Sequence, residues 1–352
     1  MSAFQLALTA LRPPDMAALA GARMLQDRLI KPAGSLGRIE DLGVQLAGIA
    51  GRVPPPVPEQ PAVAVFAADH GVVRSGVTPW PQEVTAQMVA NFCAGGAAIS
   101  VLARQHGARL VVVDVGVASP LTSSPGLLER KVRPGTDDFA DGPAMSVGDA
   151  SAALDVGADV ANTLIDDGAD LLVTGDMGIG NTTASAALIA WFTGTPPARV
   201  TGRGTGIDDE MLAVKTRVID GALDRLTDTA TPTQVLAEVG GLEIAALAGF
   251  IVAGVARRVP VVLDGVIALA AACVAHAYAP GVELGCVAGH RSPEPGSSVA
   301  LAHLGLDPLI DLGLRLGEGS GACLAVPLVR SAALVLNEMA TFDGAGVSGR
   351  NG

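Results

Sequence analysis

The chain has 352 residues, of which 49% are hydrophobic and 16% are charged, and its formal net charge is −12. A body this acidic excludes nonspecific binding to nucleic acid or to an anionic membrane surface, because both carry negative charge. The length indicates one large or two modest domains, and any phosphate site must rely on backbone N–H groups and a few Arg or Lys side chains.

Cysteine and histidine spacing matches neither a disulfide framework nor a zinc site. The four cysteines are scattered without a C-x-x-C pair, and the five histidines include no H-x-x-x-H pair. We therefore predict buried free thiols, a reducing compartment and no metal. The start of the chain lacks a secretory pattern, since Arg12-Pro13-Pro14-Asp15 interrupts its short apolar piece. We predict a cytoplasmic protein.

The N-terminal 45 residues have a helical pattern with no strand signal, and a Pro-rich connector follows at residues 51–58. Beyond it, short apolar runs alternate with helical patterns, and each run ends in a Gly-containing turn. Such alternation is typical of a parallel sheet covered by helices on both faces. The predicted strands are residues 62–66, 110–113, 171–173, 261–263 and 282–287.

Helices are predicted elsewhere in the second half of the chain. Two apolar stretches, 242–255 and 266–279, are too short to cross a membrane and are predicted as buried helices. Two further helices are predicted at residues 311–316 and 322–339. We expect the two terminal helical parts, residues 1–45 and 305–352, to form a small lobe beside a large α/β domain at residues 46–304.

Residues 76–84 combine Trp80 with a backbone stiffened by prolines. Gln87 and Met88 follow on the next helical turn, so this segment has the composition of a wall for a flat heteroaromatic ligand. Packing of Trp80 in the core is an equal alternative.

A Gly-rich turn at residues 175–184 follows the third predicted strand and opens a helix. Gly178 and Gly180 leave backbone N–H groups unpaired at a positive helix end, and Asn181 and Thr182 add side-chain donors. This pattern is suited to phosphate, although no Lys follows as in a Walker A loop. An ordinary strand-to-helix turn with a polar cap is the alternative.

Two further polar segments follow. The Gly-rich loop at residues 200–210 presents Arg203, a two-pronged anion donor, and Lys215 lies on the next predicted helix. A solvated surface Arg is the alternative, but two Gly-rich loops together favour a phosphorylated ligand. The rigid turn at residues 289–296 carries His290, which has the chemistry of a base or of an orienting hydrogen-bond donor.

The segment 314–322 places Glu318 between Gly317 and Gly319, directly before a long apolar run. Glycine leaves room for a ligand to approach, and a carboxylate in a low-dielectric surround is an effective base. The alternative is a helix N-terminus at which the macrodipole favours an acidic residue.

In their order along the chain, these blocks resemble the nicotinate-nucleotide–dimethylbenzimidazole phosphoribosyltransferase family, which makes the lower-ligand nucleotide of cobalamin. The matching segments cover nearly the whole chain: residues 31–38, 68–72, 79–85, 175–183, 201–208, 240–244, 289–293 and 314–321. The resemblance implies a Rossmann-like domain with a mainly parallel sheet, a small helical lobe from both termini, and a homodimer.

The resemblance also implies a reaction without metal or cofactor. Nicotinate mononucleotide and 5,6-dimethylbenzimidazole give α-ribazole 5′-phosphate and nicotinate, with inversion at the anomeric carbon, and Glu318 is the implied general base. The benzimidazole is expected against Trp80, Gln87, Met88 and Leu316. The ribose phosphate is expected against Gly178, Gly180, Asn181, Thr182, Arg203, Gly204, Lys215 and Ser292.

At one catalytic position the chain departs from the family pattern. Asp176 stands where the family commonly has Glu, so the side chain is one methylene shorter and its reach toward a ribose or a developing positive charge changes. The residues by themselves leave two other functions open. One is a dinucleotide-dependent oxidoreductase, although a clean G-x-G-x-x-G fingerprint is absent. The other is a noncatalytic protein that binds an azole or a nucleotide.

Overall fold

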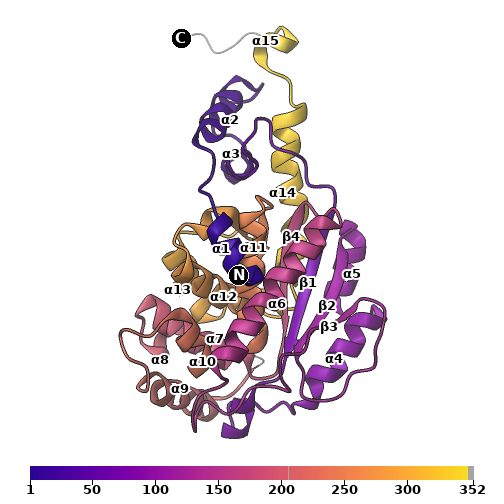
Figure 1. The fold of residues 1–352 in the computed structure, drawn as a ribbon. Helices are drawn as coiled ribbons and strands as arrows, with labels where there is room; N and C mark the ends of the chain where they lie inside the picture. Colours follow the sequence, from indigo (N-terminus) through magenta and orange to yellow (C-terminus); the bar gives the residue numbers. More distant parts are fainter. Residues whose placement is uncertain (205, 348–352) are drawn as a thin grey trace.

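The structure, a computed structural model, describes residues 1–204 and 206–347. A six-stranded sheet with the order β3-β2-β1-β4-β5-β6 lies at its centre, and all five strand pairings are parallel (Figure 1). The strands are β1 (Pro61–Ala68), β2 (Arg109–Gly116), β3 (Leu127–Glu129), β4 (Leu171–Met177), β5 (Val261–Leu263) and β6 (Cys286–Ala288). The strand order reverses between β1 and β4, and ligands bind beyond the carboxyl ends of strands at such a switch point.

Helices cover both faces of the sheet, as the alternating pattern predicts. One face packs against α6 (Val147–Asp166), α7 (Asn181–Thr193), α11 (Leu242–Ala256) and α12 (Val266–Tyr278), and the other against α4 (Glu83–Ala94), α5 (Ala98–His106) and α14 (Ser320–Glu338) (Figure 1). Successive residues of β1 point to opposite faces: Ala64 and Phe66 lie in the first core, and Val63 and Val65 in the second. Other helices are η1 (Gly71–Ser75), α8 (Pro197–Val200), α9 (Asp209–Leu223), α10 (Pro232–Val239), η2 (Val282–Gly285), α13 (Pro295–Leu304) and α15 (Phe342–Ala345).

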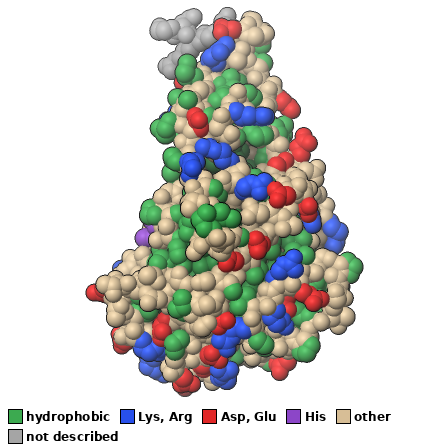
Figure 2. Space-filling model, viewed as in Figure 1, with side chains coloured by type: hydrophobic (Ala, Val, Ile, Leu, Met, Phe, Trp, Pro, Cys, Tyr) green, Lys and Arg blue, Asp and Glu red, His purple; other side chains and the backbone are tan. Residues whose placement is uncertain are grey.

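A narrow lobe projects from this body, formed by α2 (Met16–Arg28), α3 (Arg38–Ala50) and the end of α14 (Figure 1). It has a small core of its own, made of Ala22, Leu29, Val44, Ala47 and Leu336. On the face drawn in Figure 2, acidic and basic side chains are interspersed over both parts.

The first helix, α1 (Ala3–Ala10), packs on the large body rather than on the narrow lobe. It contacts α6 and α11, and the ring of Phe4 meets Tyr278 edge-on, with centroids 4.9 Å apart. The division into residues 1–45 plus 305–352 and residues 46–304 stays a prediction, and residues 348–352 of it lie outside the described part of the chain.

The predicted parallel sheet is confirmed, and two predicted elements differ. Residues 282–287 are not one strand, because the 3-10 helix η2 precedes a strand that covers only Cys286–Ala288. Residues 311–316 are not helical. Ile310 bridges His290 in parallel, and its N–H donates to the carbonyl of Gly289, so the chain leaves the sheet edge in extended form at this point. The short strand β3 was not predicted.

The apolar stretches at 242–255 and 266–279 are the buried helices α11 and α12, as predicted. By length and composition alone, Glu83–His106 and Ser320–Glu338 could cross a membrane. This is weak support, because core helices pass the same criterion. The first segment is two helices, since Gly95 ends α4 in a left-handed conformation, and the second contributes ten buried residues to the protein interior.

Candidate active site

The carboxyl ends of four neighbouring strands carry buried polar side chains. Asp69 and His70 follow β1, Asp176 lies near the end of β4, Asp264 follows β5 and His290 follows β6. Each of these side chains is at least nine-tenths buried. Since these strand ends flank the switch point, they mark the candidate site.

Glu318 reaches this edge from a turn with an unusual backbone. Gly317, Glu318 and Gly319 have φ values of 81°, 66° and 90°, so three successive residues are left-handed. A non-glycine residue in this region costs about 1–3 kcal/mol and persists where its surroundings enforce it, often at functional sites. Glu318 is 6% exposed, and its carboxylate accepts a hydrogen bond of 3.4 Å from the backbone N–H of Ile99, at the start of α5.

The surroundings raise the pKa of Glu318 above the ordinary value for a glutamate. Burial is the largest cause, the Ile99 N–H opposes it, and the negative charge of Asp264 raises the pKa further. A single long hydrogen bond does not offset burial and a neighbouring like charge. The group is therefore a stronger base than an exposed glutamate.

Asp176 lies beside the same turn, and Gly317 packs against its carboxylate. One oxygen of Asp176 accepts a hydrogen bond of 3.0 Å from the Asn181 amide. Burial, followed by the charges of Asp264 and Glu243, raises the pKa of Asp176 well above its ordinary value, and the Asn181 bond opposes this only partly. The environment favours a protonated Asp176.

A cavity of about 90 Å³ lies between this turn and the N-terminus of α7. Among the predicted site residues, it is lined by Asp176, Asn181, Thr182, Gly204, Ser292 and Leu316. The backbone N–H groups at the start of a helix favour an anion. The arrangement is suited to a phosphate.

Lys215 supports this cavity from α9. Its ammonium group is buried and donates to the hydroxyl of Thr182 (2.8 Å) and to the carbonyl of Gly202 (3.1 Å). Burial lowers the pKa of Lys215 to about 8, against the opposing charge of Glu294. A bound anion would restore the charged form.

Gly178 and Gly180 lie at the turn before α7, where side chains would not fit. A Cβ at Gly178 would meet the carbonyl of Ala68 and the ring of His70, and one at Gly180 would meet Val73 and His70. Their part in binding the nucleotide stays a prediction.

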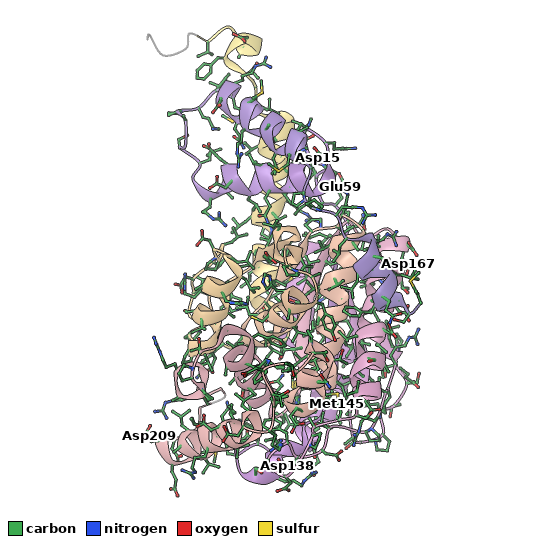
Figure 3. All side chains as sticks on the ribbon, turned by 60° about the vertical axis from the view of Figure 1, so that its left-hand side comes forward. Asp15, Glu59, Asp138, Met145, Asp167 and Asp209 are labelled. Carbon is green, nitrogen blue, oxygen red and sulfur yellow. The ribbon has the colours of Figure 1, made fainter. Side chains whose placement is uncertain are left out.

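The remaining predicted residues do not line this cavity. Arg203 donates to the carbonyl of Ile207 (2.8 Å) and pairs with the carboxylate of Asp209, which lies at the outer edge of the large body (Figure 3). Gln87 lines a different cavity of about 500 Å³, between α4 and residues 120–127.

Trp80 is 48% exposed, and Met88 packs partly buried against the core on the α14 side of the sheet. The four residues expected around the benzimidazole are therefore not gathered in one cavity, and their role stays a prediction.

Two charged residues of the cavity wall were missed from the sequence. Arg315 donates to the carbonyl of Gly204 (3.2 Å), which joins the Glu318 segment to the second Gly-rich loop. Glu294 accepts a hydrogen bond of 2.9 Å from the N–H of Gly204. Arg315 and Glu294 lie in the segments 314–322 and 289–296, which the sequence analysis describes. A charged residue within such a Gly- or Pro-rich segment was the signal that could have identified them. The described residues contain no cluster of three or more His, Cys, Asp or Glu side chains placed to hold a metal ion.

Comparison with known proteins identifies the family. Residues 11–347 match a family model described as Phosphoribosyltransferase. A relative from Salinispora tropica, named nicotinate-nucleotide–dimethylbenzimidazole phosphoribosyltransferase, is 57% identical, with 96% of this chain and 97% of the relative covered. A relative of the same name from Chloroflexus aurantiacus is 53% identical, with 99% of each chain covered.

The fold also matches solved structures. The crystal structure of CobT from Thermus thermophilus matches with a TM-score of 0.92 and 50% identity, covering 94% of this chain and 99% of that one. By sequence over its whole length and by fold, the chain belongs to the nicotinate-nucleotide–dimethylbenzimidazole phosphoribosyltransferase family.

Proposed function

We propose that this chain transfers the phosphoribosyl group of nicotinate mononucleotide to 5,6-dimethylbenzimidazole, with Glu318 as the general base. The observation that carries the proposal is the buried carboxylate of Glu318, held in a left-handed turn at the switch point of the sheet. The products are α-ribazole 5′-phosphate and nicotinate.

The chemistry requires a base more than an acid. Nicotinate leaves from a cationic pyridinium, so its departure needs no strong proton donor. The attacking benzimidazole is a modest neutral nucleophile, and removal of its N–H proton by Glu318 raises the electron density on the other ring nitrogen. A positioned base contributes about 10²–10⁴-fold to the rate. Alignment of the two substrates contributes up to roughly 7–11 kcal/mol.

The phosphate of the nucleotide is assigned to the cavity at the start of α7. Support comes from Lys215, which donates to Thr182, from the N-terminal N–H groups of α7, and from Ser292, which also lines the cavity. Asp176 lies between this cavity and the Glu318 turn, where the ribose of a phosphate-anchored nucleotide would pass. A protonated Asp176 can donate a hydrogen bond to a ribose oxygen.

The proposal includes a homodimer that works in the cytoplasm. The narrow lobe exposes apolar side chains on α2, with Met16 73% and Met24 68% exposed, and a second copy of the chain would cover such a surface. Sedimentation velocity at several concentrations measures the oligomeric state, and a monomer at all of them would contradict this part of the proposal.

Replacement of Glu318 by Gln tests the base directly. The amide keeps the size of the side chain but cannot accept the benzimidazole proton, so turnover is expected to fall by about 10²–10⁴-fold while nicotinate mononucleotide still binds. Single-turnover assays with product detection by mass spectrometry measure the rate, and calorimetry measures the binding.

The matched control is Glu338→Gln, the same change at the exposed last turn of α14, the helix that follows Glu318, and it should leave turnover unaltered. Transfer by Glu318→Gln at the parental rate would show that Glu318 is not the base. A parental chain that binds both compounds without releasing nicotinate would instead indicate a noncatalytic binding protein.

A further inference from the structure

Asp264, directly after β5, caps the helix that follows Glu318. Its side chain is buried, and one oxygen accepts a hydrogen bond of 3.2 Å from the N–H of Gly319 while the other accepts one of 2.9 Å from the N–H of Ala322. The first N–H groups of a helix have no partner within the helix. Gly319, the N-cap of α14, has no side chain to supply one, so Asp264 takes that place from a neighbouring strand.

These contacts bear directly on the backbone of Glu318. Gly319 is the next residue, and its N–H belongs to the peptide unit that Glu318 begins. On the other side, a Cβ at Gly175 of β4 would lie 2.6 Å from the carbonyl oxygen of Glu318. The left-handed conformation of Glu318 is thus fixed between a strand that admits only glycine and a carboxylate that binds the helix start.

Asp264 is itself fixed by groups from two neighbouring strands. Its backbone N–H donates to the hydroxyl of Thr174 (3.0 Å), which donates in turn to the carbonyl of Val262 (3.2 Å). The Nε2 atom of His290 lies 3.4 Å from the Asp264 carboxylate, and its ring packs against Gly321, where no side chain would fit. A carboxylate held this firmly can set the position of another residue.

We propose that Asp264 is a positioning residue for the phosphoribosyl transfer: it orients Glu318 through the start of α14, and its negative charge strengthens Glu318 as a base. This inference rests on the proposed function, because it takes Glu318 as the group that accepts the proton.

The charge can be followed through the pKa values. The groups around the pair are Asp176 on β4, His290 after β6 and Cys323 on α14, together with the Ile99 N–H at the start of α5. The charge of Asp264 adds to burial in raising the pKa of Glu318. A base acts in its deprotonated form, so activity falls as the pH drops through that pKa. The fall in activity at low pH is the acid limb of the pH profile. Removal of the Asp264 charge should lower the pKa of Glu318 and so move this acid limb to lower pH.

The test compares Asp264→Asn with Thr174→Val. The first variant removes the charge and one acceptor in a side chain of the same shape. The second keeps the charge but takes away the hydroxyl that holds the Asp264 backbone, and Val has nearly the volume of Thr. The pH dependence of kcat/KM is measured from about pH 5 to 9, a range chosen to span the titration of Glu318 and His290.

For Asp264→Asn we expect kcat/KM at neutral pH to fall by about 10²-fold, as for other misplaced catalytic groups, and the acid limb to move to lower pH. For Thr174→Val we expect kcat to fall with the acid limb unmoved. The KM for nicotinate mononucleotide should change little in either variant, because the residues around the phosphate cavity are untouched.

His290 loses a partner in Asp264→Asn, so its own titration is separated with a second pair of variants. The acid limb of the double variant Asp264→Asn with His290→Gln should lie below that of His290→Gln alone. If the double variant and His290→Gln have the same acid limb, the shift seen in Asp264→Asn comes from His290, and the electrostatic role of Asp264 is overturned.

Two other outcomes overturn the proposal. One is a parental rate and profile in Asp264→Asn; the other is a loss of rate with no movement of the acid limb, since that is what a structural role alone produces. Should Asp264→Asn fail to fold, parental kcat in Thr174→Val overturns the positioning role, and a kcat that falls while the KM for nicotinate mononucleotide stays parental supports it. Failure of the proposed function is a separate result: the parental chain then forms no α-ribazole 5′-phosphate.

Discussion

At the scale of single residues, the candidate site concentrates acidic groups where water is scarce. Asp176, Glu243, Asp264 and Glu318 are all buried near the carboxyl ends of the strands. Their mutual repulsion and burial outweigh the available hydrogen bonds at Asp176 and Glu318, whose pKa values are both raised.

The titration of Lys215 should set an upper limit to the pH range in which nicotinate mononucleotide binds well. Because its pKa is about 8 and a phosphate binds the ammonium form, KM for nicotinate mononucleotide should rise as the pH increases beyond about 8, while kcat changes less. Initial rates over a range of substrate concentrations and pH values measure both constants.

Lys215→Met supplies the control for this pH dependence. It removes the titrating charge, so its KM should be high at every pH and should lack the rise. A flat KM in the parental chain across this range would contradict the role of Lys215 at the phosphate.

Some site residues could be predicted from the sequence because they stand next to backbone features with fixed geometry. Asn181 and Thr182 follow a glycine turn at a helix start, so their position beside the cavity follows from the strand and helix pattern. The direction of a long side chain on a loop has no such marker. Arg203 turns to Asp209, six residues further on, and no pattern in the sequence distinguishes that partner from a bound phosphate.

At the scale of elements, one buried ion pair joins the segment directly after β1 to the start of α11. His70 and Glu243 lie 2.6 Å apart, and neither side chain is exposed. Gly178 and Gly241 approach the His70 ring, and Gly180 approaches its Cβ, so closely that a Cβ at any of them would collide with or press against His70. Burial opposes protonation of His70, but the charge and hydrogen bond of Glu243 outweigh it and raise the pKa of His70.

His70→Ala should therefore cost much of the stability of the chain. It leaves the buried carboxylate of Glu243 without its partner, and the expected loss is about 3–5 kcal/mol in the free energy of unfolding. Urea denaturation followed by circular dichroism measures it. Since the folded pKa of His70 is raised, its contribution is full below the unfolded pKa and is lost as the pH rises through the folded pKa.

The control for His70→Ala is His276→Ala. His276 pairs with Glu283 at 2.8 Å, but its side chain is 27% exposed, so water can replace the partner and a loss of about 1 kcal/mol or less is expected. Equal losses of free energy of unfolding in the two variants would show that burial does not make the His70–Glu243 pair more important for stability than a partly exposed pair.

Helices and strands were predicted correctly where the local sequence pattern determines them. They were missed where a contact with a distant part of the chain determines the structure. Continuous apolar runs identified β1, β2, β4 and β5, because strands of a covered parallel sheet are buried on both faces. The predicted helix at 311–316 failed because Ile310 pairs with the chain that leaves β6, a contact across twenty residues. The short β3 has no buried residue, so it lacked the apolar signal.

At the scale of the whole molecule, α14 connects the candidate site to the narrow lobe. Arg330, in its second half, donates to the carbonyls of Pro58 (2.8 Å), Glu59 (3.0 Å) and His106 (3.2 Å). Figure 3 shows Glu59 where the lobe meets the body and Asp15 within the lobe. One side chain therefore ties the connector and the end of α5 to the helix.

Arg330→Ala should lower the free energy of unfolding by about 1.5–3 kcal/mol, because three carbonyls, two of them half-buried, lose a charged donor. Guanidinium denaturation measures the change. Arg23→Ala, on the exposed face of α2, is the matched control and should stay within about 0.5 kcal/mol of the parental chain. Similar values for the two variants would contradict the anchoring role of Arg330.

The length of α14 has a geometric consequence. Its 19 residues begin directly after the turn that carries Glu318, and its last turns belong to the lobe. Each residue of a helix advances it by about 1.5 Å and rotates it by about 100°. One residue inserted after Ala332 would swing Leu336 away from Val44 and Ala47 by more than a quarter of a revolution. The helical periodicity thus fixes the number of residues between Glu318 and the lobe. Changes in this helix are confined to substitutions, because an insertion or a deletion would rotate one end against the other.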